Sequence, residues 1–182
     1  TTNVTTSNAN DDIDLGTLAS TGGVTLTTTG ATGNASVVNA TTLGLTASVG
    51  GDLVATASTG DLNMGGSAGG NLTATATTGN ITDTATLTIG GTSTATTSAA
   101  NATIDLGTLA STGAVSLNTN GATGNATVVN ATALDLAASS IGGILVATAT
   151  TGNVTDSGTV TVGDTTNVTT SNANDDIDLG TL

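Results

Sequence analysis

The sequence predicts an all-β fold: a right-handed parallel β-helix in which three short parallel sheets wind around one axis. Three observations predict it. The chain repeats itself at fixed offsets, apolar and polar letters alternate at period two, and its 182 residues include no aromatic side chain. Connections between parallel strands are right-handed as a rule, which sets the expected hand. Thr, Gly, Asn and Val dominate every window, so no helix is expected.

The longest repeat in the sequence relates Thr1 to Thr165. The eighteen letters TTNVTTSNANDDIDLGTL open the chain at Thr1 and return at Thr165, which defines a 164-residue repeat. We therefore expect residues 1–182 to form one continuous solenoid segment, made of one repeat plus eighteen residues of the next. Two shorter offsets relate similar segments inside the period: a 91-residue offset carries Ile13 to Ile104, and a 73-residue offset carries Leu72 to Leu145.

Recurrent glycines divide the period into seven predicted coils. Most of these have about twenty residues, which is the size of one small repeat unit. The two longer coils hold about ten extra residues, which we interpret as longer strands or outward bulges. The predicted coils are 22–50, 51–69, 70–90, 91–112, 113–142, 143–163 and 164–182, the last of which corresponds to a coil continuing through residues 1–21.

The segment 70–90 shows how one predicted coil is built. Leu72, Ala74 and Ala76 alternate with threonines, which indicates a strand with one buried face. The letters TGN then break the run as a turn, and a short second strand begins at Ile81. A third strand, TLTI, directs its Leu and Ile inward. Three strands and three corners close the coil.

Stacked coils bury one another's inner faces, because a coil of this size has no core of its own. At a rise of about 4.8 Å per coil, seven coils span roughly 34 Å. Small aliphatic side chains suit the narrow interior, and continuous backbone ladders supply much of the stability. The predicted interior contains Val24, Leu26, Leu53, Ala55, Leu72, Ala74, Val115, Leu117, Leu145 and Ala147.

The composition excludes several classes of function. Thirteen aspartates give a formal net charge of −13, and without Lys or Arg the chain has nothing to neutralise phosphates. Nucleic acid and anionic lipid are therefore not expected partners. The absence of Cys and of long apolar runs argues against disulfides and membrane insertion. We expect no enzyme, because no His, Cys, Lys, Glu or Tyr is present to activate the abundant hydroxyls.

Acidic clusters are the only candidates for a metal site. Carboxylates with Asn and carbonyl oxygens suit Ca²⁺, but the letters NANDDID match neither an EF-hand loop nor the nonapeptide of Ca²⁺-binding β-rolls. A solvated acidic turn is the preferred interpretation, and no resident cofactor is expected. The weak Ca²⁺ candidates are Asp11, Asp12, Asp14, Asp175, Asp176 and Asp178.

A polar residue recurs at the corner before the second strand of each coil. Side chains stacked at this corner would bond along the axis as an asparagine ladder and hold the turns in register. We prefer this structural role to ligand binding. The predicted ladder contains Asn34, Asp61, Asn80, Thr103, Asn125, Asn153 and Asp176.

Two further features leave alternatives open. Ten Asn-X-Ser/Thr sequons, including Asn39 and Asn130, arise from composition and are glycosylation sites only if the source organism modifies them. Outward threonines form a predicted hydroxyl–methyl array that resembles ice-binding faces, although β-branched residues are also good strand formers. The array contains Thr25, Thr27, Thr73, Thr75, Thr77, Thr94, Thr96, Thr148 and Thr150, and Val54, Ser116, Asn118 and Val146 interrupt it.

The cadence of GAVSLN, NATALDLAASSIGG and LVATATTGNVTDSGTVTVGDTTNVTT is similar to the repeat regions of filamentous haemagglutinin-type exoproteins. The similarity covers essentially the whole chain. It implies the right-handed β-helical shaft of a large bacterial adhesin, exported through a two-partner-secretion or autotransporter pathway, and it supplies no functional residue. This chain departs from that family in lacking Lys, Arg and aromatic residues.

These observations together predict a structural extracellular filament, secreted to a bacterial cell surface, sheath or biofilm matrix. Its expected partner is itself, through end-to-end continuation or a homopolymer, with a surface or matrix ligand left open. The shaft of a secreted adhesin is the alternative, and an ice-binding solenoid is a remote one. A flanking secretion domain and a distinct tip would favour the adhesin, whereas further repeats alone would favour the filament.

Overall fold

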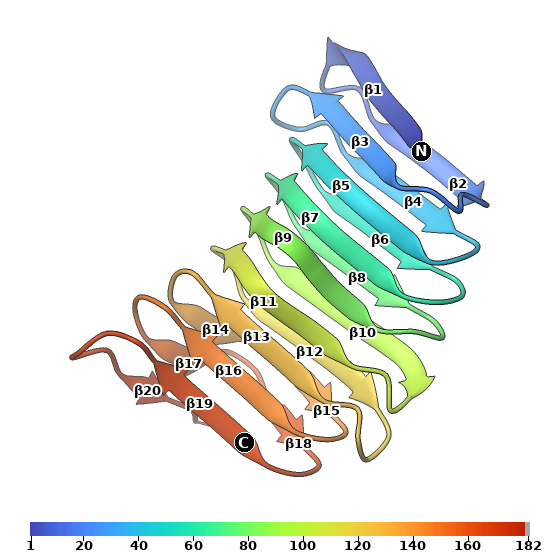
Figure 1. Cartoon of the computed structure of the whole chain (residues 1–182). Helices are drawn as coiled ribbons and strands as arrows, with labels where there is room; N and C mark the ends of the chain where they lie inside the picture. The colour runs from blue at the N-terminus through green and yellow to red at the C-terminus, as the bar shows by residue number, and fades with distance from the viewer. Residues whose placement is uncertain (181–182) are drawn as a thin grey trace.

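The computed structural model describes residues 1–180 as a β-solenoid (Figure 1). Every regular element in this range is a strand, and the strand pairs are parallel. In Figure 1 one sheet lies nearer the viewer and the other lies behind it, while the chain advances from β1 to β19 in a right-handed sense. The predicted all-β, right-handed parallel β-helix is confirmed.

Two long sheets run along the solenoid, nine-stranded sheet A and eleven-stranded sheet B. Sheet A consists of β1 (Thr2–Ala9), β3 (Val24–Thr29), β5 (Leu43–Val49), β7 (Leu62–Ala68), β9 (Ile81–Ile89), β11 (Ile104–Ser111), β13 (Ala126–Asn130), β16 (Leu145–Ala149) and β19 (Thr166–Thr170). Sheet B consists of β2 (Ile13–Leu18), β4 (Ala35–Asn39), β6 (Leu53–Ala57), β8 (Leu72–Ala76), β10 (Ser93–Ala100), β12 (Val115–Asn120), β14 (Leu134–Leu136), β17 (Val154–Asp156) and β20 (Ile177–Asp178), with β15 (Ser139–Ile141) and β18 (Val160–Val162) as a short branch.

The strands form two sheets, so the prediction of three sheets is wrong. A turn has one strand in each sheet and two corners, except where β14–β15 and β17–β18 place two short strands in sheet B. In the segment 70–90, the predicted second and third strands form the single strand β9. The register between β7 and β9 shifts between Met64 and Gly66. A bulge of this kind bends a strand without ending it, so β9 continues where the sequence predicted two strands and a corner. Among residues 1–180, a separate third strand is present only as β15 and β18.

The 164-residue repeat contains eight turns, one more than predicted. Eight steps along sheet A lead from β1 to β19, and β19 has the letters of β1. The error lies in the two long coils. The coil 22–50 contains β3, β4 and β5, and the coil 113–142 contains β12, β13 and the β14–β15 pair. The extra residues in each are a further half-turn, not an outward bulge.

Related segments lie on opposite faces because an odd number of half-turns separates them. Strands β3 and β12 are copies at the 91-residue offset, nine half-turns apart, and they lie in sheets A and B respectively. Strands β8 and β16 are copies at the 73-residue offset, seven half-turns apart, and they also lie in opposite sheets. These motifs are therefore displayed on both sides of the solenoid.

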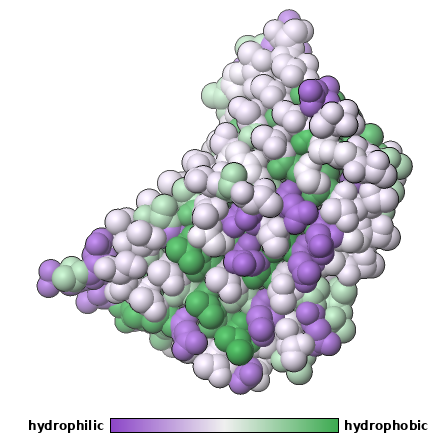
Figure 2. All heavy atoms as spheres, in the orientation of Figure 1, coloured by the Kyte–Doolittle hydropathy of each residue, from purple (hydrophilic) through white to green (hydrophobic). Residues whose placement is uncertain are grey.

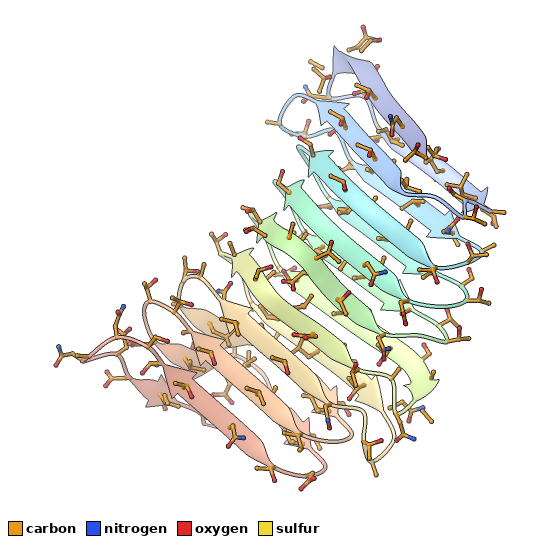
Figure 3. The ribbon with its side chains drawn as sticks, in the orientation of Figure 1. Carbon is orange, nitrogen blue, oxygen red and sulfur yellow. The ribbon has the colours of Figure 1, made fainter. Side chains whose placement is uncertain are left out.

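Inward side chains form one continuous apolar column between the sheets. Strands such as β4 and β16 alternate buried and partly exposed residues, as the period-two pattern predicts. All ten predicted core residues, from Val24 to Ala147, are at most 1% exposed. The outward side chains are mostly short and polar (Figure 3). The lean core and the parallel ladders together define the cross-section.

The core is open at its last turn. Ile13 in the first turn is 5% exposed, whereas its copy Ile177 in the last turn is 47% exposed. The difference comes from the neighbouring strand, because β4 covers β2, whereas β20 ends the order of sheet B. Each turn is therefore completed by the next turn along the chain.

Candidate functional site

Side chains at the corner before sheet B join one turn to the next. The side-chain Oδ1 of one residue accepts a hydrogen bond from the backbone N–H at the same corner one turn later. The distances are 2.7 Å from Asn34 N to Asp12 Oδ1, 2.8 Å from Asp52 N to Asn34 Oδ1, 2.7 Å from Asn71 N to Asp52 Oδ1 and 2.9 Å from Thr92 N to Asn71 Oδ1. These contacts form a ladder of side-chain to backbone bonds along the axis.

The ladder at this corner resumes in the last turn. Asn153 Oδ1 accepts a hydrogen bond from Asp176 N at 2.9 Å. Asp176 is the copy of Asp12 in the next 164-residue repeat, so the ladder that begins at Asp12 has the same residue at its far end. The corner chemistry therefore follows the 164-residue period.

The corner before sheet A carries a separate ladder. Asp61 Oδ1 accepts from Asn80 N at 2.8 Å, and Asn80 Oδ1 accepts from Thr103 N at 2.8 Å. Further along, Asn125 Oδ1 accepts from Ile144 N at 2.8 Å. The predicted single column is therefore wrong: Asn34, Asn153 and Asp176 line one corner, and Asp61, Asn80, Thr103 and Asn125 line the other.

The bonds of both ladders also differ from the predicted kind. They reach backbone N–H groups, whereas the prediction had side chains bonding to one another. A carboxylate is only an acceptor, so it cannot continue a chain of amide-to-amide bonds. A corner N–H lies outside the regular strand ladders and needs an acceptor, which a neighbouring Asn or Asp side chain supplies.

Two buried asparagines fasten adjacent turns from within. Asn39 is 0% exposed, and its Oδ1 accepts from Ser20 N at 2.9 Å while its Nδ2 donates to Ser20 O at 2.9 Å and Thr42 O at 2.8 Å. Asn130, its copy at the 91-residue offset, is 1% exposed and makes the equivalent pair of bonds to Ser111. Sequence reasoning treated both as sequons; their burial excludes glycosylation in the folded state.

Glycine columns allow close axial stacking at the corner that follows sheet A. A Cβ on Gly69 would overlap the carbonyl oxygen of Gly50, and a Cβ on Gly90 would overlap that of Gly69. The same arrangement recurs at the opposite corner, where Gly163 meets Gly142. The glycines that punctuate the sequence are therefore required by the distance between turns, and they prevent a side chain from separating the coils.

The predicted Ca²⁺ ligands take part in local contacts and in contacts between turns. Asp12 Oδ1 accepts from Asn34 N, Asp14 Oδ1 accepts from Ser36 Oγ at 2.6 Å, and Asp11 Oδ2 accepts from Asn8 Nδ2 at 2.9 Å. Residues 1–180 hold no group of three acidic, His or Cys side chains placed to bind a metal ion. At these positions, and at Asp175, Asp176 and Asp178, the solvated acidic turn stays the preferred prediction and Ca²⁺ a weak alternative.

The aspartates of the solenoid are dispersed along the axis. Asp14 lies opposite Ser36, Asp105 lies between Thr82 and Thr127, and Asp178 lies opposite Thr155. Among the strand pairs of residues 1–180, none places one aspartate opposite another. Because the side chains supply no cation to offset thirteen negative charges, this spacing limits the repulsion between neighbouring turns.

The predicted threonine array is divided between the two faces. Thr25, Thr27 and Thr148 lie in sheet A. Thr73, Thr75, Thr94 and Thr96 lie in sheet B, where they form a compact block because β8 pairs with β10. Val54 and Ser116 border that block on its two sides. Thr77 and Thr150 lie outside the strands, so no single flat array runs the length of the described turns.

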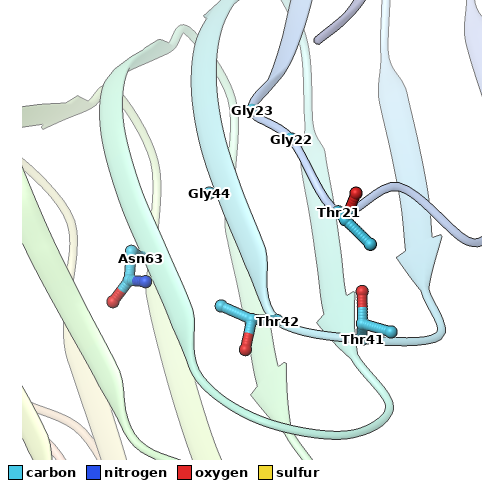
Figure 4. A pocket seen from close by; sticks show the side chains of 7 residues that line it. All are labelled: Thr21, Gly22, Gly23, Thr41, Thr42, Gly44 and Asn63. Carbon is cyan, nitrogen blue, oxygen red and sulfur yellow. The ribbon is translucent and has the colours of Figure 1, made fainter.

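The visible face, over sheet A, is mostly near-neutral in hydropathy, with scattered hydrophilic and hydrophobic groups (Figure 2). A hollow of about 410 Å³ lies on it, where Gly23 and Gly44 expose the backbone (Figure 4). Thr41 and Asn63 are among its walls. At the 91-residue offset Ala114 and Asp135 replace the two glycines, and Asp135 Oδ1 is buried without a hydrogen-bond partner. The hollow holds no charged group and identifies no ligand.

None of the described residues forms a helix long and apolar enough to cross a bilayer. The residues that the structure assigns clear roles, Asn and Asp at the corners, buried Asn and stacked Gly, all act between turns. The sequence signal that would have revealed the buried asparagines is their recurrence in the letters VVNAT at the 91-residue offset.

Comparison with known proteins matches the chain to one family model. That model describes repeats of unknown function (DUF5649) and matches residues 50–118 and 123–181. The starts of the two matches, at residues 50 and 123, are separated by the shorter offset found within the repeat. Neither the curated proteins nor the solved structures contain a match. Because the model covers well over half of the sequence, the chain belongs to this family of repeats.

Proposed function

We propose that this chain is a structural segment of an extracellular filament built from tandem β-solenoid turns. One observation supports the proposal most strongly: both sheets continue through every described turn, and the last turn repeats the first. A rod that can extend without a change in cross-section suits a mechanical role. The residues at the corners act between turns, which agrees with a role carried by the whole rod.

Several features support placement outside a bacterial cell, in a surface layer, sheath or matrix. The high net negative charge without cations favours solubility and discourages binding to nucleic acid or anionic lipid. The cadence of the repeats is similar to haemagglutinin-type shafts, whose β-helical form the solenoid shares. The shaft of a secreted adhesin is the second candidate, and it would carry its receptor site outside these turns. The divided threonine array does not favour ice binding.

Small-angle scattering and electron microscopy of proteins with one, two and three concatenated 164-residue repeats test the proposal. Eight turns at about 4.8 Å each add about 38 Å to the rod per repeat, with a constant cross-section. A maximum dimension that grows in steps of this size supports the filament. Compact particles whose cross-section grows with repeat number would contradict it.

A further inference from the structure

The last turn of the solenoid is a copy of the first turn, but without the turn that covers it. Strands β19 and β20 have the letters of the corresponding parts of β1 and β2. Asn10 and its copy Asn174 share the left-handed backbone conformation, with φ values of 64° and 72°. This one backbone feature of the corner is therefore kept in the last turn, although residues 171–173 do not continue β19 as residues 7–9 continue β1.

The first turn shows which strands such a turn binds. Strand β1 pairs with β3, and β2 pairs with β4. Four side chains of the first turn add hydrogen bonds to the second. Thr6 Oγ1 accepts from Thr29 N at 2.9 Å, Asn10 Oδ1 from Thr32 N at 3.2 Å, Asp12 Oδ1 from Asn34 N at 2.7 Å and Asp14 Oδ1 from Ser36 Oγ at 2.6 Å.

We propose that the open β19–β20 end is a docking surface for the strand pair that has the sequence of β3 and β4, supplied by a further repeat of the same polypeptide. Thr170, Asn174, Asp176 and Asp178 are the copies of the four acceptors. Asn174, Asp176 and Asp178 are exposed at this end. The apolar part of the surface is Ile177, 47% exposed, which the docked turn covers as β4 covers Ile13. This inference rests on the proposed filament and specifies its junction.

The surface also discriminates against the wrong turn. Two intact copies stacked end to end would bring β19–β20 against the identical β1–β2. Adjacent strands lie about 4.8 Å apart, so Asp176 would face Asp12 and Asp178 would face Asp14. Like charges directly opposite each other destabilise a sheet, and no strand pair of residues 1–180 contains such a contact. To extend the solenoid with the same order of turns, a turn with the sequence of residues 22–40 must therefore follow β20.

The two copies of one aspartate provide the test. In the 182-residue protein, Asp12→Ala removes an acceptor in use, and we expect the thermal midpoint to fall by about 2–4 °C, whereas Asp176→Ala does not lower it. In a tandem protein with residues 19–182 appended after residue 182, Asp176→Ala removes a working acceptor. Amide exchange at the appended copy of Asn34 then becomes at least about tenfold faster than in the unmutated tandem, for a loss of about 1.4 kcal/mol.

Amide exchange also reports docking directly. Exchange across β19 and β20 is fast in the 182-residue protein and at least about tenfold slower in the tandem, because the added turn buries this edge. The matched control appends residues 1–182 in place of 19–182, so that the two identical turns meet. We expect weaker protection there, increasing with salt as the carboxylates are screened. Equal protection in the two tandems, or no effect of Asp176→Ala in either, would overturn the proposal.

The outcomes separate this proposal from the filament. If the tandem scatters as a longer rod but the β19–β20 edge gains no protection, the filament stands and the docking surface is wrong. If the tandem is not elongated, the filament itself is wrong. Sedimentation of the 182-residue protein tests whether two identical end turns can stack on each other. Polymers at neutral pH and low salt would contradict the expectation that they do not.

Discussion

Asn39 and Asn130 show how a single polar residue holds two turns together. Each side chain is fully or almost fully buried, and each uses both its oxygen and its nitrogen, so that the backbone N–H and C=O of one residue in the preceding turn are satisfied. Buried backbone groups without partners are costly; Thr41 and Thr132 also donate to the two carbonyls, but the asparagine oxygen supplies the side-chain acceptor for each N–H. These residues therefore fix the register of one turn on the next.

Asn39→Ala should lower the free energy of unfolding by about 1–3 kcal/mol, because Ser20 N–H loses its buried acceptor and Ser20 O keeps only the Thr41 hydroxyl as a donor. Asn130→Ala should have a similar effect through Ser111. Denaturant unfolding followed by circular dichroism measures both. Asn167→Ala, on the exposed edge strand β19, is the control and should change the stability by less than about 0.5 kcal/mol. Equal effects at the buried and exposed sites would contradict the role.

At the scale of strands and corners, side-chain volume is limited by the spacing of the turns. Sequence reasoning placed the turns at the glycines correctly, because glycine marks corners. It could not show that Gly69 and Gly90 stack over the carbonyl groups of the glycines one turn before. Gly44, in contrast, lies in an outward position of β5 where a Cβ meets nothing within 4 Å.

Gly69→Ala should destabilise the fold by about 1–3 kcal/mol, because the new methyl group overlaps the Gly50 carbonyl and forces two turns apart. Gly44→Ala should be neutral or stabilising by up to about 1 kcal/mol, because it only reduces the freedom of the unfolded chain. Thermal unfolding of the two variants beside the parent protein gives the comparison. A stable Gly69→Ala protein would show that the corner has room that the structure does not show.

The period-two alternation identifies inward residues but not the sheet to which a strand belongs. For this reason the ten predicted core residues are correct, while the number of turns and of sheets is wrong. A strand of sheet A and a strand of sheet B have the same pattern, as β3 and β12 illustrate. The corners before the two sheets also share Asn and Asp, so residues such as Asn34 and Asp61 were assigned to one ladder. The lengths of the segments 22–50 and 113–142, about one and a half turns each, were the sequence evidence for the additional turn.

For the whole molecule, the absence of Lys and Arg determines how stability depends on salt. Thirteen carboxylates in a compact rod repel one another more than in an expanded chain, and no cationic side chain offsets them. Because the aspartates are dispersed, few carboxylates lie close to one another, but the repulsion between more distant carboxylates remains.

The thermal midpoint should therefore rise by about 2–4 °C between about 10 mM and about 200 mM sodium chloride, as the screening length falls from about 30 Å to less than about 8 Å. Scanning calorimetry at neutral pH measures the shift. The variant Asp105→Asn, at an exposed position of β11, should raise the midpoint at low salt and reduce the salt dependence. A midpoint that falls with salt would show that attractive charge pairs dominate.

Strands β3 and β12, which are copies of each other, lie on opposite sheets, and this placement affects any molecule that lies alongside the rod. A neighbour that recognises a motif on one sheet meets a close copy of it on the other after half a rotation and an axial shift of four and a half turns, about 22 Å. The next copy comes after three and a half turns, about 17 Å. One rod therefore presents close copies of one surface on both of its faces, in two rows staggered along the axis.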